Sequence, residues 1–257
     1  MPERANLPVL RLAFPRELNT VHQLEITSRC NLRCTYCPSP HLGRPKVDMT
    51  QAVFTRALEW VHHYVIKGTQ HVLNLAGIGE STLHPLFPEF VAQAREVMGP
   101  DRELIFATNG LLCDDLLIAK LRPSKPAVWV SLHRPEKASI AAARYKAAGL
   151  LVGVSAHPSL DPMDWAGQIK NKWSEELGAG VKRQAAAPCP WIRHGMAMVM
   201  ADGRLTTCCY DSTGIGVVGH VDDKIGSVGV APYALCNDCD QELGIHGITQ
   251  RFHEARS

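Results

Sequence analysis

Three cysteines lie within eight residues, at Cys30, Cys34 and Cys37, in the spacing C-x3-C-x2-C. They follow an apolar segment, 24–27, that is predicted to end a strand. Thiolates clustered in a loop are metal ligands far more often than core residues. Three thiolates on a four-iron cluster leave one iron without a protein ligand. That iron can bind a small molecule, as a catalytic zinc keeps a position open for water.

A structural zinc site is the alternative for this loop. His41 follows Cys37 by four residues, so these two side chains could form a Cys3His site together with Cys30 and Cys34. Such sites are common, and the spacing alone leaves the choice between zinc and an iron–sulfur cluster open. The rest of the chain must decide it.

The composition is that of an ordinary globular protein. The chain has 257 residues, 46% of them hydrophobic and 20% charged, enough for one large domain or for one domain and a small appendage. The net charge of +2 indicates no general attraction to nucleic acid or to a membrane surface. There is no apolar run of about 18 residues for a membrane span, and no signal or lipidation pattern at the N-terminus, so we expect a cytoplasmic protein.

Nine cysteines in a reducing compartment indicate metal binding or catalysis rather than disulfides. Eight of them fall into groups near residues 30–37, 189–209 and 236–239. Cys113 stands alone, and we expect it to be a small buried hydrophobe.

From residue 21 short apolar segments alternate with helical ones. Helices are predicted over about 51–67, 87–98, 114–121 and 135–148, the first with Thr50 as its N-cap. Strands are predicted at about 23–27, 71–76, 104–107, 127–132, 150–155 and 181–184. This alternation indicates βαβ units and a parallel sheet. Five or six units in about 165 residues make an incomplete barrel, because a full barrel of eight needs about 250.

Polar residues follow several of these strands, at the edge where such folds bind ligands. His133 and His157 end the fourth and fifth strands, and either could accept a proton near neutral pH. A hydrogen-bonded surface histidine is the plainer interpretation of each. Arg183 could play the same part.

A second group of cysteines lies beyond residue 188, where helical periodicity stops: Cys189, Cys208, Cys236 and Cys239. Asp202-Gly203 between two extended runs predicts a hairpin that brings Cys189 and Cys208 together. The C-x2-C pair at 236–239 can then close a site of four thiolates. Cys209 could replace Cys208, and a four-cysteine zinc ribbon is the competing interpretation.

The glycine pattern G-x-G-x-x-G at 214–219 does not predict a dinucleotide site, because no strand precedes it and no helix follows it. It is predicted to be a connection in the small C-terminal part of the chain.

Two sets of motifs resemble the radical S-adenosylmethionine (radical SAM) superfamily. The first is C-x3-C-x2-C at 30–37. The second, Gly77-Ile78-Gly79-Glu80, matches the family's "GGEP" segment, with Ser81 in place of the usual proline. The resemblance implies a 4Fe–4S cluster on the three cysteines of the loop, whose open iron binds SAM. It assigns to SAM binding the residues Tyr36, Gly77, Gly79, Glu80, Asn109 and Ser131.

The later cysteines resemble the "twitch" domain, the short form of the SPASM extension, which holds one auxiliary 4Fe–4S cluster. The spacing G-x4-C from Gly203 favours Cys208 over Cys209. The resemblance therefore implies an α/β fold: a partial (β/α)5–6 TIM-like barrel with a small cysteine-rich β-hairpin (twitch) domain. We expect an irregular lead-in over 1–20, the barrel over 21–184 and the twitch part over 185–257.

The function that this resemblance implies is reductive cleavage of SAM to a 5′-deoxyadenosyl radical, followed by hydrogen abstraction from a substrate. The layout is most similar to the 2-deoxy-scyllo-inosamine dehydrogenase type, which favours a two-electron oxidation with the auxiliary cluster as electron acceptor. A radical isomerase, or an enzyme that forms C–C or C–S bonds in a peptide or natural product, is the alternative. A non-catalytic zinc module is a third. Expected partners are a small-molecule or short peptide substrate and a flavodoxin- or ferredoxin-type electron donor.

Overall fold

Eight strands of the protein form one sheet. A computed structural model of the chain describes residues 16–155, 165, 168 and 189–237. The strands of the sheet are β2 (Thr20–Leu24), β3 (Val72–Asn74), β4 (Glu103–Thr108), β5 (Ala127–Ser131), β6 (Leu151–Ser155), β7 (Met196–Val199), β8 (Arg204–Thr206) and β9 (Val217–His220). They are ordered β6-β5-β4-β3-β2-β7-β8-β9. All pairs from β6 to β7 are parallel, and only β7-β8 and β8-β9 are antiparallel.

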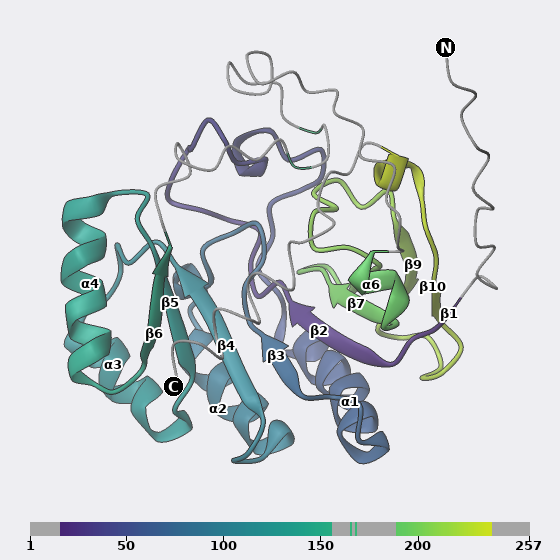
Figure 1. Ribbon diagram of the computed structural model, residues 1–257, viewed down its shortest axis with the longest axis horizontal. Helices are drawn as coiled ribbons and strands as arrows, with labels where there is room; N and C mark the ends of the chain where they lie inside the picture. The colour runs from purple at the N-terminus through teal and green to yellow at the C-terminus, as the bar shows by residue number, and fades with distance from the viewer. Residues whose placement is uncertain (1–15, 156–164, 166–167, 169–188, 238–257) are drawn as a thin grey trace, which may run out of the picture.

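Helices connect the parallel strands and flank the sheet, as Figure 1 shows. They are α1 (Gln51–Lys67), α2 (Phe87–Met98), α3 (Asp115–Leu121) and α4 (Pro135–Ala147), and a short helix, α6 (Pro190–Arg193), precedes β7. The predicted cap of α1 is confirmed, since the Thr50 hydroxyl accepts a hydrogen bond from the Val53 amide and Gly68 ends the helix in the left-handed conformation. Asp114 caps α3 in the same way through the Leu117 amide. These elements confirm the predicted α/β fold with a partial barrel.

The core lies between the helices and the sheet. Phe54 of α1 and Phe90 of α2 stack with ring centroids 3.9 Å apart, and both side chains are fully buried. Phe87 and Phe106 meet edge to face at 5.0 Å. Cys113 packs against this core as a partly buried side chain, as expected of a small hydrophobe.

The hairpin β7-β8 extends the barrel sheet rather than forming a sheet of its own. β7 pairs in parallel with β2, with Thr20 opposite Met196 and Leu24 opposite Val199. The predicted turn at Asp202-Gly203 is confirmed, because β7 and β8 are antiparallel around it. Cys189 and Cys208 flank this hairpin in the sequence, and the hairpin lies beside β2, the strand that precedes the first cysteine group.

The N-terminal part of the described chain differs from expectation. β1 (Arg16–Glu17) pairs with β10 (Gly229–Val230) in a separate two-stranded sheet, although residues 1–20 show no strand pattern. β2 begins at Thr20, three residues before the predicted start, because Thr20 and Val21 already pair with β7. The predicted strand at 181–184 lies outside the described residues. Within the described part of the chain, no helix has the length and apolar character that crossing a membrane requires.

Candidate active site

The loop with Cys30, Cys34 and Cys37 leaves the sheet just beyond the end of β2. Its thiols are partly buried and close enough to affect one another's ionisation. Burial raises the pKa of the Cys30 thiol and raises that of Cys37 to about 11. Backbone amides already point at two of the sulfurs, from Leu32 to Cys30 Sγ at 3.4 Å and from Ser39 to Cys37 Sγ at 3.5 Å. Hydrogen bonds of this kind stabilise metal-bound thiolates.

A Cys3His zinc site in this loop would need His41 as its fourth ligand. The His41 side chain is exposed at the end of the 3₁₀ turn η1 (Ser39–His41). A four-iron cluster spaces its ligands more widely, because each thiolate binds a different iron.

Tyr36 and His133 meet at the same edge of the sheet. The Tyr36 hydroxyl lies 3.0 Å from His133 Nδ1, and the His133 amide donates to the Ser131 carbonyl at the end of β5. The Trp165 indole donates to the Tyr36 carbonyl at 3.0 Å and packs edge to face against Tyr210, at 5.2 Å. The structure thus brings together three predicted site residues, Tyr36, Ser131 and His133. His157 and Arg183 lie outside the described residues.

Glu80 braces two strand ends with its carboxylate. One oxygen accepts hydrogen bonds from the Thr108 hydroxyl at 2.7 Å and from the Thr82 hydroxyl at 2.6 Å, and the other accepts the Asn109 amide at 2.7 Å. The side chain is 3% exposed, and burial raises the pKa of its carboxyl. Asn109 in turn donates to the Asn31 side chain at 2.8 Å. The loop after β3, the end of β4 and the cysteine loop are thereby held together.

The glycines at 77 and 79 are required by packing inside the protein. A Cβ on Gly77 would lie 2.4 Å from Glu25 Cγ, and one on Gly79 would lie 2.1 Å from the Thr27 carbonyl oxygen. The Glu80 amide also donates to the Arg29 carbonyl at 2.8 Å. The sequence attributes these glycines to a close approach of SAM, and the structure gives a second reason, which is the contact with the segment between β2 and Cys30.

Gly79→Ala is expected to lower the free energy of unfolding by about 3 kcal/mol, because the new methyl group meets backbone oxygen that cannot move aside. Urea unfolding of the holoprotein measures the effect. Gly149→Ala is the control: Gly149 has a φ of +72° and open space around it, so alanine there costs about 1 kcal/mol. Equal losses in the two variants would contradict the packing argument.

The second cysteine group surrounds the hairpin. Cys189 precedes α6, Cys208 follows β8, and Cys236 lies in the 3₁₀ turn η5 (Ala234–Asn237). The three thiols are close enough to affect one another's ionisation, and burial raises the pKa of Cys189 and Cys236. Cys239 lies outside the described residues.

Cys208 and Cys209 have different surroundings. Cys208 Sγ accepts the Tyr210 amide at 3.4 Å and a hydrogen bond from Cys209, which lowers the pKa of the Cys208 thiol. Cys209 is a partly buried side chain that packs against an apolar cluster of Trp191, Met196, Met198 and Met200, and the pKa of its thiol is raised, first by the bond to Cys208 and then by burial. Cys208 is therefore better suited to bind metal as a thiolate.

Buried polar atoms around both groups fit the presence of bound cofactors. In the described part of the chain, four buried side-chain atoms without a hydrogen bond lie close in sequence to these cysteines. Ser39 Oγ and Arg44 Nη1 follow Cys37, and Trp191 Nε1 and Thr207 Oγ1 lie near Cys189 and Cys208. The buried Tyr233 hydroxyl interacts with the Cys208 thiol. Native proteins leave few such atoms unpaired, so their concentration here favours iron–sulfur clusters with acceptor sulfurs.

His22 provides a pH-dependent contribution to stability beside the second group. Its ring meets Trp191 edge to face at 5.4 Å, and burial lowers its pKa to about 4. In the unfolded chain the histidine binds a proton near pH 6.5, whereas in the folded chain it binds one only near pH 4. The free energy of unfolding therefore falls as the pH drops from 6.5 toward 4. We expect a loss of about 2 kcal/mol between pH 7.5 and 5.

Urea unfolding of the wild type and of His22→Gln at the two pH values measures this contribution. The difference between the two proteins isolates the histidine from other titrating groups. If both lose the same free energy, His22 is not buried as described.

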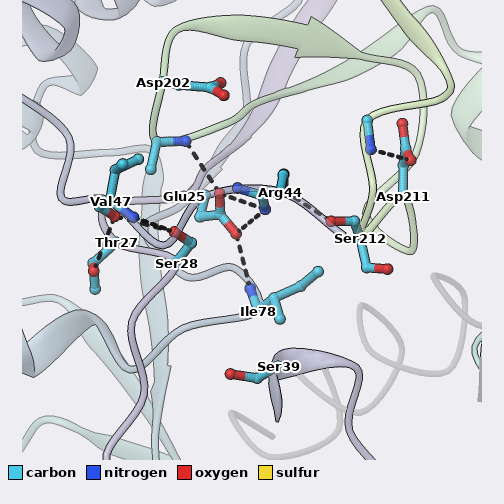
Figure 2. A network of polar contacts seen from close by, with 12 residues as sticks. Glu25, Thr27, Ser28, Ser39, Arg44, Val47, Ile78, Asp202, Asp211 and Ser212 are labelled. Atoms are coloured by element: carbon cyan, nitrogen blue, oxygen red, sulfur yellow. Dashed lines mark hydrogen bonds and ion pairs between the residues drawn. The ribbon is translucent and has the colours of Figure 1, made fainter. Parts of the chain in front are cut away.

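A buried ion pair joins the two cysteine groups, and nothing in the sequence predicts it. Arg44 Nη2 lies 2.7 and 2.8 Å from the two carboxylate oxygens of Glu25. The arginine side chain is 3% exposed and that of the glutamate is fully buried. Figure 2 shows the pair between the amide of Ile78 and the segment at Ser212. No local pattern could have revealed two charges that pair across different loops.

The family model described as "Radical SAM superfamily" matches residues 24–138. This match covers less than half of the chain, and it shows that residues 24–138 are similar to a radical SAM domain. The matched range includes the first cysteine loop, the Gly77–Glu80 turn (77–80) and His133.

Curated relatives match parts of the chain. A tungsten-containing aldehyde ferredoxin oxidoreductase cofactor-modifying protein of Pyrococcus furiosus is 37% identical over 98 residues, which are 38% of this chain and 26% of the relative. A GTP 3′,8-cyclase of Chlorobaculum tepidum is 33% identical over 139 residues, 51% of this chain and 37% of the relative. The chain thus spans about a quarter to two fifths of the length of these two proteins.

Among solved structures, BtrN in complex with AdoMet and 2-DOIA aligns with a TM-score of 0.65 at 18% identity, covering 94% of this chain and 91% of that one. SuiB of Streptococcus suis, bound to its precursor peptide SuiA, aligns with a TM-score of 0.55 at 14% identity, covering 89% of this chain and 67% of that one. At these identities the likeness shows the fold alone.

Proposed function

We propose that this protein is a radical SAM enzyme, that it oxidises its substrate by two electrons, and that an auxiliary 4Fe–4S cluster accepts one of them. Cys30, Cys34 and Cys37 would hold the SAM cluster, and Cys189, Cys208, Cys236 and Cys239 the auxiliary one. With SAM bound, a cluster held by these three cysteines would supply the electron for reductive cleavage of SAM. The observation that carries the proposal is that three later thiols lie close enough to affect one another's ionisation, beside a hairpin that extends the barrel sheet.

The residues of the chain act on the substrate by positioning it and by taking a proton. The substrate would lose a hydrogen atom from a C–H group and then a proton from an O–H or N–H group. One electron then remains to be removed from the substrate, and the auxiliary site would take it up. His133 is our candidate proton acceptor, since its ring lies at the strand edge beside Tyr36. His157 stays a candidate from the sequence. Tyr36 and Ser131 would contact SAM, and Gly77, Gly79, Glu80 and Asn109 would shape the loop beside it.

Isomerisation or bond formation is the second candidate function. The match to GTP 3′,8-cyclases favours it, and several structural neighbours were solved with peptides, including SuiB with SuiA. A small molecule or a short peptide is therefore the proposed substrate, and a flavodoxin- or ferredoxin-type protein the proposed electron donor. A structural role for zinc at the second group is the remaining alternative.

Metal analysis of anaerobically purified and reconstituted protein tests the proposal. Two clusters correspond to about eight irons and eight sulfides per chain and a brown protein. A protein with about four irons and one zinc would assign the second group to zinc and contradict the oxidation mechanism proposed here, while leaving the radical SAM chemistry intact.

A further inference from the structure

The two cysteine loops are joined through one buried pair of charges, Glu25 and Arg44. Glu25 follows β2 on the way to Cys30, and Arg44 lies between Cys37 and α1. Both residues therefore belong to the segment that holds the first group. The Glu25 Oε1 also accepts the Ile78 amide at 3.4 Å, and its Cγ fills the space left by Gly77.

The same pair binds the segment that holds the second group. Arg44 Nε donates to the Ser212 carbonyl at 2.8 Å, and the Ala201 amide donates to Glu25 Oε2 at 3.1 Å. Ala201 lies in the turn between β7 and β8, and Ser212 lies just past Cys208 and Cys209. Figure 2 shows how these contacts converge on the two side chains.

Stability alone does not account for a charge pair at this place. A buried ion pair often contributes less than well-packed apolar residues of similar volume, whereas charged hydrogen bonds that reach several segments at once fix the relative position of those segments. Here one nitrogen, Arg44 Nη2, contacts both carboxylate oxygens, and Arg44 Nε donates to the Ser212 carbonyl. The carboxylate also accepts the backbone amides of Ile78 and Ala201. The pair is thus suited to fix the distance and orientation between the two cysteine loops.

We propose that Glu25 and Arg44 are positioning residues that fix the separation of the two clusters and with it the transfer of an electron between them. This inference rests on the proposed function, because it needs both clusters. Arg44 Nη1 is a further buried donor, without a hydrogen bond in the described part of the chain. Since electron transfer slows steeply with distance, a small displacement of either loop changes its rate.

The double variant Glu25→Met/Arg44→Met tests this role. It replaces the charges by flexible apolar side chains of similar length, so folding is retained while the directional contact is lost. Pulsed EPR on the reduced holoprotein measures the dipolar interaction between the two clusters. We expect about eight irons per chain, as in the wild type, and a distribution of inter-cluster distances at least about twofold broader.

An unchanged distance distribution in a double variant that carries both clusters would overturn the positioning role. If the double variant fails to assemble both clusters, Arg44→Lys answers the same question, because lysine keeps the charge but lacks the Nε donor that binds the Ser212 carbonyl. Its distribution is then expected to broaden, and a wild-type distribution overturns the inference. A wild-type protein with only one cluster would contradict the proposed function itself, and the iron count distinguishes that outcome.

Discussion

Cys34→Ala is expected to abolish the formation of 5′-deoxyadenosine from SAM and to lower the iron content from about eight to about four per chain. Cys34 lies between Cys30 and Cys37 in the sequence. Burial raises the pKa of the Cys30 and Cys37 thiols, and the nearby Cys34 thiol raises both further. Without it two thiolates remain, too few to hold a cubane with one open iron. Product analysis by chromatography and iron analysis of the anaerobic variant measure both effects.

Cys113→Ala is the matched control for this variant. Cys113 is also a partly buried cysteine, but it packs against the core far from either group in sequence. Its loss should leave the iron content and SAM cleavage unchanged. Retention of SAM cleavage by Cys34→Ala would show that the loop does not carry the cofactor.

Cys208→Ser is expected to remove about four irons while leaving SAM cleavage in place, whereas Cys209→Ser keeps about eight irons. The reason is the difference between the two adjacent thiols. Cys208 Sγ accepts hydrogen bonds from the Tyr210 amide and from Cys209, and its pKa is lowered. Cys209 packs against the apolar cluster that contains Met196, Met198 and Met200, and the pKa of its thiol is raised by its bond to Cys208 and by burial.

The two serine variants control for each other, because they make the same chemical change at neighbouring positions. Cys209→Ser is expected to lose about 1 kcal/mol of stability by placing a hydroxyl in an apolar cluster. EPR spectra of the reduced proteins show which cluster is present. Loss of iron from Cys209→Ser with full iron in Cys208→Ser would reverse the assignment of the ligand.

Much of the fold follows from local patterns in the sequence. The helix at Gln51–Lys67 could be bounded because Thr50 and Gly68 are strong start and stop signals. The position of Cys30–Cys37 (30–37) beyond a strand follows from the alternation of apolar segments. The antiparallel hairpin follows from Asp202-Gly203.

Contacts between distant segments could not be predicted in the same way. The parallel pairing of β7 with β2 depends on which sheet edge is free. The residues of β7, Met196–Val199, do not themselves indicate which strand they pair with. Glu25 and Arg44 look like two ordinary charged residues until the fold buries them together. Glu80 is a residue type that often binds ligands, yet in the structure its carboxylate accepts hydrogen bonds from the Thr108 hydroxyl and the Asn109 amide.

Incubation of the wild-type holoprotein with SAM and a one-electron reductant, without oxygen, tests most directly whether the loop at 30–37 holds a cluster with an open iron. We predict that 5′-deoxyadenosine and methionine accumulate and that addition of SAM changes the EPR signal of the reduced cluster at this loop. A protein with about eight irons per chain that leaves SAM intact, with an EPR signal unaffected by SAM, would contradict the assignment.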